Sequence, residues 1–412
     1  MMSQSKEAQP PMILQCRTNN HLPDEIVLEI LARLPVKSVL RFRCVCKSWY
    51  SFISDPNFIS THLNHNHHHQ HHYVIHRPKI IPFPFHTPPS RSNLQVCTLA
   101  FDRTFETISE SRIPFTFQSG YPHLVGSCNG ILCFTDFITS KSKDVYLWNP
   151  SIRKFKRLPD TCLTQLRTLV LGFGYDSQNN DYKVVRISQT RVKDVLALEV
   201  EVYSLSSDSW KRVGLGISWT PNAFSFSFNG ILAFPFVSGH LHWMIEVKEV
   251  GGGQEMFFSA MILSFDVNSE KFKELPLPSD EGSFIVTKCV TSFKGKLALI
   301  KLGYGVQPHS MLCSIWVMKE YGVLDSWNKL CVLPVDDFID FTGFTNYGIL
   351  LLQNMPRLVS TNCELERKYK SVLIDPETLH ENEISIQVNY HLDVATYMES
   401  LALLDGANVV FH

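Results

Sequence analysis

Residues 127–134 read Ser-Cys-Asn-Gly-Ile-Leu-Cys-Phe, an Asn-Gly pair between two apolar runs. Asn-Gly is the strongest short signal for a β-hairpin, because both central residues of a type I′ turn need positive φ. The same strand-turn-strand pattern returns as SFNGILAF, SFKGKLAL and TNYGILLL at 227–234, 292–299 and 345–352. Looser copies are GFGYDSQNNDYKVVRI at 172–187 and LALLDGANVVF at 401–411. These six copies lie roughly 50 to 65 residues apart, the spacing of propeller repeats.

A second hairpin follows most copies, with an aromatic or apolar residue just after its polar turn. Its segments are 145–159, 200–213, 261–278, 314–334 and 371–385. Two hairpins per repeat make a four-stranded antiparallel sheet, and such sheets arranged radially form a β-propeller. The copy at 401–411 has no second hairpin, whereas 94–101 and 105–109 supply two strands before the first complete repeat. We therefore predict six blades, one of them shared by N-terminal and C-terminal strands.

A helical pattern precedes the repeats. Residues 22–56 read LPDEIVLEILARLPVKSVLRFRCVCKSWYSFISDP, with apolar residues at helical spacing. Pro23 begins a first short helix, Leu34-Pro35 separates it from a second, and Asp55-Pro56 ends a third. A unit of roughly 40 residues is usually too small to bury this much apolar surface alone. We interpret the remaining apolar stripe as a docking face for another protein.

Two other interpretations of this helical unit remain open. A small DNA-binding domain would explain five positive charges with no acid between them, at Arg33, Lys37, Arg41, Arg43 and Lys47. Against it, the third helix carries Trp49, Tyr50, Phe52 and Ile53 where base-reading Arg, Asn or Gln would be needed. A helical cap with a purely structural role is the other alternative.

The helical stretch resembles the F-box family, with its Leu-Pro start at residues 22–23, LPVKSVL at 34–40 and CKSW at 46–49. The repeats resemble the plant F-box-associated, or kelch-like, propellers through LVGSCNGILCF, LWNPSIRKFKRLP, LGFGYDSQNNDYKVVRI and VYSLSSDSWKRV. True kelch repeats end a strand with paired glycines, and the one such cluster, Gly251–Gly253, lies in a predicted loop. The similarity is therefore to the F-box-associated branch and not to kelch proper.

This resemblance implies a non-catalytic adaptor, the substrate-recognition subunit of an SCF-type (Skp–cullin–F-box) ubiquitin ligase. The F-box would dock a Skp-type adaptor held by a cullin, and the propeller would capture a protein for ubiquitination and degradation. A scaffold that causes no degradation, or a propeller enzyme, are the alternatives. The implied adaptor-binding residues are Leu22, Pro23, Ile26, Leu31, Leu34, Pro35, Val36, Leu40, Val45, Cys46 and Trp49.

The expected fold class is α+β multidomain, a three-helix F-box followed by an all-β propeller. The expected parts are a disordered leader at 1–20, the F-box at 21–63, a His/Pro-rich linker at 64–93 and the propeller at 94–412. The histidine tract of the linker is His67, His68, His69, His71 and His72. A defined metal site needs fixed ligand geometry, so we interpret the tract as solvated linker, with metal binding as the alternative.

Contacts of the propeller with the captured protein are expected in polar or long loops. The candidate loops are 178–181, 238–242, 250–255, 304–310 and 357–366, although each could equally be a tolerated insertion. The candidate substrate-binding residues within them are Gln178, Asn180, His240, His242, Tyr304, Gln307, His309 and Arg357.

Composition and motifs exclude several other classes. The 38 basic and 39 acidic residues give a net charge of -1, so neither nucleic acid nor an anionic membrane is an expected partner. Eleven cysteines without a Cys-x-x-Cys pair favour a reducing compartment, the nucleus and cytoplasm. Gly126–Gly130 resembles a nucleophile elbow, but Phe228 and Phe293 replace Cys128 in other repeats, which favours packing over catalysis. No cofactor, metal, catalytic residue or membrane span is expected.

Overall fold

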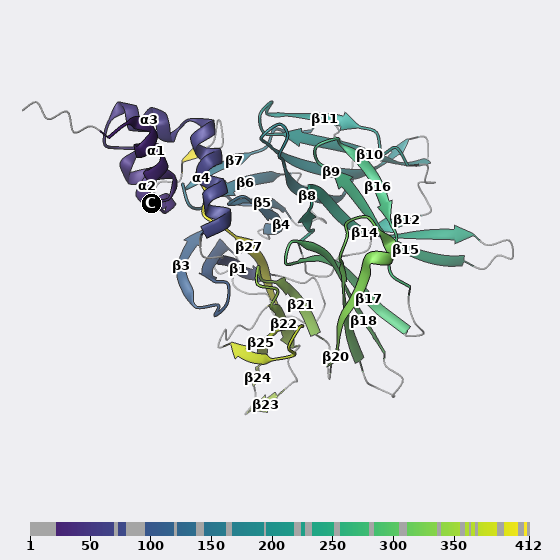
Figure 1. Cartoon of the computed structure of the whole chain (residues 1–412). Coiled ribbons are helices and arrows are strands. Elements are labelled where there is room, and N and C mark those ends of the chain that lie inside the picture. Colours follow the sequence, from purple (N-terminus) through teal and green to yellow (C-terminus); the bar gives the residue numbers. More distant parts are fainter. Residues whose placement is uncertain are drawn as a thin grey trace, which may run out of the picture.

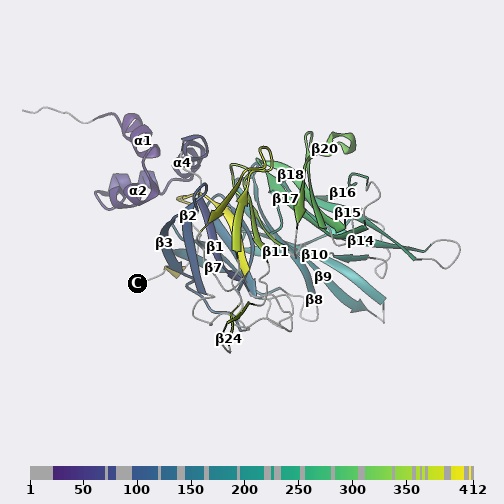
Figure 2. The same cartoon turned by 90° about the horizontal axis from the view of Figure 1, so that it is seen from below.

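Four helices are followed by a six-bladed β-propeller in the computed structural model of the chain (Figure 1). The description covers residues 22–69, 73–79, 95–118, 122–136, 144–161, 167–192, 195–217, 224–226, 233–250, 256–279, 284–304, 311–335, 339–354, 359–361, 364–366, 370–384, 391–402 and 408–409. Two perpendicular views place the helices against one side of the propeller (Figure 2). This architecture confirms the predicted fold class.

The helices are α1 (Asp24–Ala32), α2 (Val36–Phe42), α3 (Lys47–Ile53) and α4 (Pro56–His69). Pro23 and Pro35 stand directly before α1 and α2 in an extended conformation, where a residue that lacks an N–H group costs no hydrogen bond. The length of the fourth helix is a correction to the sequence prediction. It continues through Asn64–His69, which we had expected to be linker, and it packs on α1 and α3.

Blades 1 and 3 are four-stranded antiparallel sheets, and blade 2 has a fifth strand. Blade 1 has the strand order β27 (His391–Tyr397), β1 (Tyr73–Lys79), β2 (Val96–Phe101), β3 (Thr107–Arg112). Blade 2 consists of β4 (Pro122–Cys128), β5 (Ile131–Asp136), β6 (Val145–Asn149) and β7 (Lys154–Arg157), with β28 (Asn408–Val409) on its outer edge. Blade 3 consists of β8 (Arg167–Asp176), β9 (Asp181–Val192), β10 (Val195–Ser204) and β11 (Ser209–Val213).

The last three blades follow the same plan. Blade 4 consists of β12 (Phe224–Phe226), β13 (Phe236–Val237), β14 (His240–Val250), β15 (Met256–Asp266) and β16 (Lys271–Leu275). Blade 5 consists of β17 (Phe284–Phe293), β18 (Lys296–Tyr304), β19 (Met311–Met318) and β20 (Trp327–Val335), with the 3₁₀ turn η2 (Leu324–Ser326). Blade 6 consists of β21 (Ile339–Phe344), β22 (Leu350–Asn354), β25 (Lys370–Ile374) and β26 (Glu381–Ile384), with a separate hairpin β23 (Val359–Thr361) and β24 (Glu364–Glu366).

The ring is closed inside blade 1, where β27 from the C-terminal part pairs with β1 from the N-terminal part. Arg77 lies opposite Asp393 in this pairing, and its Nη1 is 3.2 Å from the Asp393 carboxylate and 2.6 Å from the Pro122 carbonyl oxygen. Both charged side chains are buried. A shared blade was predicted, but the strands that share it differ from the prediction. We had placed β1 in the linker and had expected 401–411 to supply the C-terminal hairpin.

The predicted turn chemistry is present at the ends of several hairpins. Asn129 and Gly130 both have positive φ, at 48° and 78°, and Lys294 and Gly295 repeat this at 47° and 75°. In blade 4 the described hairpin turns at Ser238–Gly239. The turn predicted at residues 229–230 lies outside the described residues. The leader and most of the Pro-rich part of the linker also lie outside them.

The two faces of the ring differ in their connections. Because neighbouring strands are antiparallel, the turns after the first and third strands of a blade lie on one face. We call this the tight-turn face, and its turns include 129–130, 150–153, 177–180 and 205–208. The connections after the second strand and between blades lie on the opposite face. Tyr304, at the end of β18, marks that opposite face.

The core of the propeller lies mainly between adjacent blades. Trp243 of blade 4 is fully buried against blade 3, and its Nε1 donates a hydrogen bond to the Leu171 carbonyl oxygen at 3.1 Å. Gly172 permits this packing, because a Cβ there would lie 2.6 Å from the Trp243 ring. Each blade therefore completes the core of its neighbour. Among the described helices, none combines the length and apolar character needed to cross a bilayer.

Candidate docking site and its surroundings

The helical unit, α1 to α4, has a small core that is completed from outside. Its buried members are Leu31, Ala32, Val36, Val39, Ile53, Phe58 and Leu401. Leu401 belongs to the segment that follows β27, and Ile152 of the β6–β7 turn packs at the edge of the same cluster. The propeller therefore covers one side of the helical unit with apolar side chains.

Large apolar side chains remain exposed on the other parts of this unit. Leu22, Ile26, Ile30, Val45 and Tyr50 have 58, 48, 48, 63 and 55% of their surface exposed, and we call these five the docking residues. Ile26 and Ile30 are four residues apart on α1 and so lie on one helix face. Neighbouring exposed apolar side chains, as on this face of α1, are typical of a surface that a partner covers.

The structure divides the eleven predicted adaptor-binding residues into three groups. Exposed are Leu22, Pro23, Ile26, Pro35, Val45 and Cys46, and half-buried are Leu34, Leu40 and Trp49. Leu31 and Val36 are only 2 and 1% exposed, so their prediction as surface docking residues is corrected. Both point into the core that Leu401 completes. Ile30 and Tyr50 were not predicted, although Ile30 follows Ile26 by one helical turn in the same apolar stripe.

Local contacts hold the region between α2 and α3 in place. The Cys46 sulfur accepts the backbone N–H of Trp49 at 3.5 Å, which caps the start of α3. Phe42 and Trp49 pack edge to face with ring centroids 5.4 Å apart. The Arg43 guanidinium lies 4.4 Å from the centroid of the Tyr50 ring. Arg43, one of the five cations that suggested nucleic-acid binding, is thus engaged within the unit.

Polar contacts join α4 to the rest of the molecule. A ring nitrogen of His62 lies 2.9 Å from the Leu34 carbonyl oxygen, and its other nitrogen lies 3.2 Å from the Asn66 side chain. Asn66 also donates to the Glu399 carbonyl oxygen at 3.3 Å. Burial lowers the pKa of His62, so its ring is neutral near pH 7. Asn66 belonged to the predicted solvated linker, yet its side chain is buried here.

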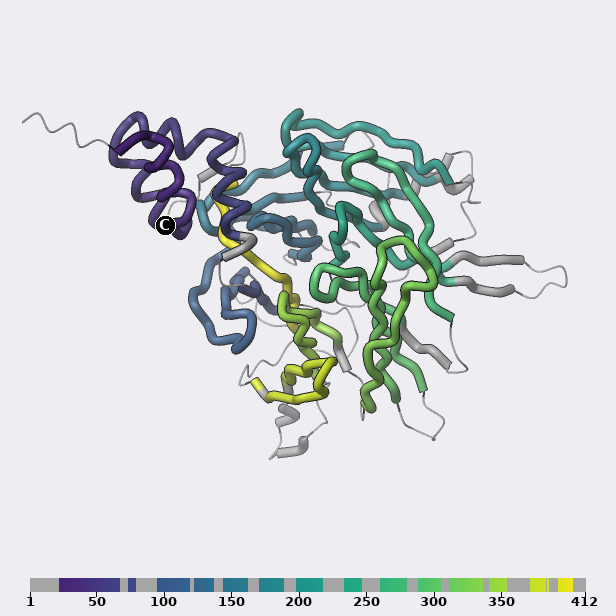
Figure 3. Tube along the Cα trace, viewed as in Figure 1, coloured from purple at the N-terminus to yellow at the C-terminus, as the bar shows by residue number. Residues whose placement is uncertain are grey.

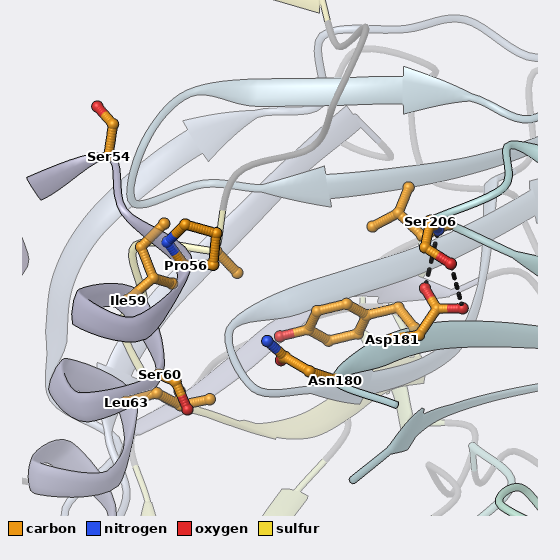
Figure 4. A pocket seen from close by; sticks show the side chains of 11 residues that line it. Ser54, Pro56, Ile59, Ser60, Leu63, Asn180, Asp181 and Ser206 are labelled. Carbon is orange, nitrogen blue, oxygen red and sulfur yellow. Dashed lines mark hydrogen bonds between the residues drawn. The ribbon is translucent and has the colours of Figure 1, made fainter. Parts of the chain in front are cut away.

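A pocket of about 220 Å³ lies between the helical unit and blade 3 (Figure 4). Pro56, Ile59 and Leu63 form its helical wall. Asn180 and Ser206 stand on the opposite wall, where Ser206 donates hydrogen bonds to the buried Asp181 carboxylate. The helices therefore meet the tight-turn face without filling the space above blade 3.

The predicted substrate-binding residues do not form one site. Gln178 and Asn180 are exposed on the tight-turn face beside the helical unit, and His240 is half-exposed in the turn of blade 4. Tyr304 is 43% exposed on the opposite face. Gln307, His309 and Arg357 lie outside the described residues, so their prediction is not tested.

His242 is a correction to that prediction, because its side chain is fully buried. One ring nitrogen is 2.8 Å from the Tyr321 hydroxyl, and the other is 3.2 Å from the Pro235 carbonyl oxygen. Burial lowers the pKa of His242 to about 3, and the backbone contact opposes this only in part. The residue joins blades 4 and 5 as a neutral structural group and cannot reach a partner protein.

A second cavity, of about 100 Å³, opens on the axis of the ring. Its walls come from the innermost strands and include the hydroxyl-bearing residues Ser127, Thr291, Ser292, Thr342 and Thr396. Cys128, the residue of the elbow-like motif, is buried in the ring, and burial raises its pKa to about 12. A thiol in this state is not an activated nucleophile. Across the described residues, no group of three His, Cys, Asp or Glu side chains is arranged to hold a metal ion.

Comparison with known proteins adds the family. Residues 20–61 match the model of the F-box domain, and residues 90–404 match that of the F-box associated beta propeller domain. The F-box/kelch-repeat protein At3g23880 of Arabidopsis thaliana is 30% identical over 356 residues, covering 84% of this chain and 88% of the relative. F-box protein CPR1 of the same plant is 28% identical over 330 residues, covering 75 and 72%.

A search of solved structures finds YjhT at 12% identity and a TM-score of 0.37, covering 65% of this chain and 86% of that one. A similarity at this level carries no argument about function. The two family matches, which cover α1 to α3 and most strands of the six blades, are what decide the assignment. The chain therefore belongs to the family of plant F-box proteins that carry an F-box-associated β-propeller.

Proposed function

We propose that this chain is the substrate-recognition subunit of an SCF-type ubiquitin ligase. The docking residues of the helical unit bind a Skp-type adaptor, and the adaptor connects the chain to a cullin. The propeller holds a protein that is to be ubiquitinated and degraded. The chain performs no chemistry, because its contribution is to raise the effective concentration of the captured protein near the conjugating enzyme.

The observation that carries this proposal is the exposure of the docking residues. Removing apolar surface from water is favourable by about 25 cal/mol per Å². A partner that covers these side chains therefore gains binding free energy. The propeller buries its large apolar residues far more completely, as Trp243 and Tyr203 illustrate. Exposed apolar side chains of the ring, such as Tyr304 and Leu379, lie on different blades, whereas those of the helical unit lie within one short part of the chain.

The propeller's binding surface and the cellular compartment belong to the same proposal. Tyr304 is our candidate contact on the opposite face, because it is an exposed aromatic side chain away from the helical unit. All eight cysteines within the described part of the chain are free thiols. Free thiols are usual in reducing compartments, which supports the nucleus and cytoplasm as the place of action.

The test is capture of a purified Skp-type adaptor by the full chain. Ile26→Asp combined with Val45→Asp places two charges among the docking residues and should reduce adaptor affinity at least a hundredfold. Leu379→Asp is the matched control, because Leu379 is 53% exposed on the propeller and should have no effect. Circular dichroism confirms that each variant is folded. Undiminished binding by the double variant would overturn the assignment of the docking residues.

A second measurement separates a ligase subunit from a scaffold. In plant cells, a protein captured by the propeller should accumulate when the double variant replaces the wild-type chain. Proximity labelling with and without proteasome inhibition identifies that protein. Equal abundance in both cases would favour a scaffold that does not cause degradation.

A further inference from the structure

The segment Tyr397–Ala402, which we call the strap, lies between the ring and the helical unit. It continues from β27, the innermost strand of blade 1, at the tight-turn face. Figure 3 shows this C-terminal part of the chain, coloured yellow, passing beside the purple α4. The strap is therefore in a position to connect the two regions, although it lies more than 300 residues after the helices.

Blade 2 holds one side of the strap through buried hydrogen bonds. The Asn149 side-chain amide donates to the Ser400 and Ala402 carbonyl oxygens at 3.2 and 3.1 Å. Asn149 and Ser400 are both fully buried. The Ser151 hydroxyl lies 2.7 Å from the Tyr397 hydroxyl. The strap is thus fixed to the ring at its beginning, middle and end.

The β4–β5 turn is shaped to let the strap approach closely. A Cβ at Gly130 would lie 2.6 Å from the Ser400 hydroxyl oxygen and 2.7 Å from the Met398 carbonyl oxygen. Gly130 also has a φ of +78°, which side-chain-bearing residues rarely adopt. The turn and the strap therefore fit only because residue 130 is glycine.

The helical unit holds the other side of the strap. Leu401 is 3% exposed and belongs to the helical core, whereas its neighbour Ala402 belongs to a core cluster of blades 2 and 3. Two neighbouring residues of one short stretch therefore serve two cores. Asn66 adds a hydrogen bond from α4 to the Glu399 carbonyl oxygen.

An electrostatic attraction also links the strap to the helical unit, between Glu399 and Lys37. Burial raises the pKa of the Glu399 carboxyl group, and the positive charge of Lys37 on α2 partly offsets this. On the other side, the pocket of Figure 4 separates α4 from blade 3. The strap therefore supplies Leu401 and the Glu399 carbonyl oxygen to the contacts that orient the helical unit, and Ile152 of the β6–β7 turn adds an apolar contact.

We propose that the strap is a positioning element that holds the docking residues in one orientation relative to the ring. Leu401 and Asn66 anchor it to the helices, while Asn149 and Ser151 anchor it to blade 2. This inference rests on the proposed function. If the helical unit binds an adaptor and the ring binds a captured protein, the strap would hold these two partners at a fixed distance and angle from each other. The orientation itself is a property of the free chain and can be measured without either partner.

The experiment measures the distribution of distances between two spin labels by pulsed electron paramagnetic resonance. Labels on non-natural amino acids replace Ser51 of α3 and Lys319 of blade 5, which are both exposed, so that the native thiols stay untouched. The wild-type chain should give one narrow distribution. Asn66→Ala with Leu401→Ala should widen it at least twofold, whereas Thr61→Ala, an exposed change on the same helix, should not.

Two further variants separate positioning from simple loss of structure. Asn149→Ala with Ser151→Ala releases the strap from the ring and leaves the helical core intact, and it should widen the distribution as well. Leu401→Met, which keeps an apolar side chain of similar volume, should give the same narrow distance distribution as the wild-type chain. A broad wild-type distribution, or narrow ones for both releasing variants, would overturn the inference. Failure of the wild-type chain to bind an adaptor would overturn only the proposed function.

Discussion

The helical unit and the propeller are both built from short elements, but they bury their apolar surface in different ways. In the ring, every blade packs between two others, and Trp243 and Leu263 reach 0% exposure. In the helical unit, Val45 and Leu22 are 63 and 58% exposed. Its buried core also includes Leu401, which comes from the segment after β27. Closure makes the ring self-sufficient. A small open unit has no such solution: Leu401 from the same chain covers one side of it, and we propose that an adaptor covers another.

The largest effect should come from breaking ring closure. Asp393→Ala leaves the Arg77 guanidinium buried without its carboxylate, which should reduce the free energy of unfolding by about 3–5 kcal/mol. Denaturant unfolding of the full chain measures this loss. Glu381→Ala, at an exposed acid of blade 6, should change it by less than about 0.5 kcal/mol. Equal stability of the two variants would show that closure does not sustain the ring.

A pair of leucines in the two regions sharpens the comparison. Leu401→Ala should cost about 2–5 kcal/mol because it leaves a cavity, and the cost should fall on the helical unit. Hydrogen exchange should therefore quicken in α1 to α4 and stay unchanged in the blades. Leu392→Ala is the matched change, since Leu392 is 1% exposed in blade 1. It should quicken exchange in the ring alone, and the reverse pattern would contradict the division into two cores.

A pH effect is expected at the contact of blades 1 and 6. The Asp102 carboxylate accepts the backbone N–H of Asn346 at 2.9 Å, and burial raises the pKa of Asp102 to about 6, an effect that hydrogen bonds from Asn346 and Thr345 reduce. The pKa in the unfolded chain is about 3.9. The folded state thus binds the proton more tightly, and the contribution of this group to stability falls as pH rises from about 4 to about 6. At 1.36 kcal/mol per pKa unit, the fall is at most about 3 kcal/mol.

Asp102→Asn should remove this part of the pH dependence, because the amide does not titrate. Denaturation midpoints measured between pH 4 and pH 7 would show a flatter profile than that of the wild-type chain. Asp325→Asn, at an exposed acid near η2, should keep the wild-type slope. An unchanged slope in Asp102→Asn would mean that the carboxyl group titrates normally in the ring.

The smallest effect on stability should come from the docking residues. Val45→Ser removes an exposed apolar side chain and should change the free energy of unfolding by less than about 0.5 kcal/mol. The same change should weaken adaptor binding about tenfold, which is about 1.4 kcal/mol. Val323→Ser, at a valine 40% exposed on blade 5, should leave both quantities unchanged. A loss of stability without a loss of binding would assign Val45 to the core instead.

Much of the ring could be predicted because its signals are local. Asn129-Gly130 and Lys294-Gly295 turn where the sequence indicates, since a type I′ turn needs residues that tolerate positive φ. Strand β1 was missed because β27, one of its two neighbours in the blade, lies more than 300 residues later in the sequence. Arg77 reads as a solvated residue, and its burial is explained by distant partners, the Pro122 carbonyl oxygen and the Asp393 carboxylate 316 positions later.

The same limit applies to the candidate sites. Helical periodicity showed that Leu31 and Val36 share a face with other apolar residues, but not that Leu401 would cover that face. His242 reads as an exposed turn residue until Tyr321 supplies its hydrogen bond from 79 positions away. Ile26 and Val45 were predicted as docking residues and are exposed in the structure. Whether an adaptor contacts them stays a prediction.

The position of Leu401 also has a consequence for how the protein is made. Translation delivers α4 roughly 330 residues before Leu401, which at about 5–20 residues per second is a delay of tens of seconds. Until then, the core of α1 to α4 lacks the Leu401 side chain. A chain that ends before Leu401 would therefore have helices whose core is incomplete.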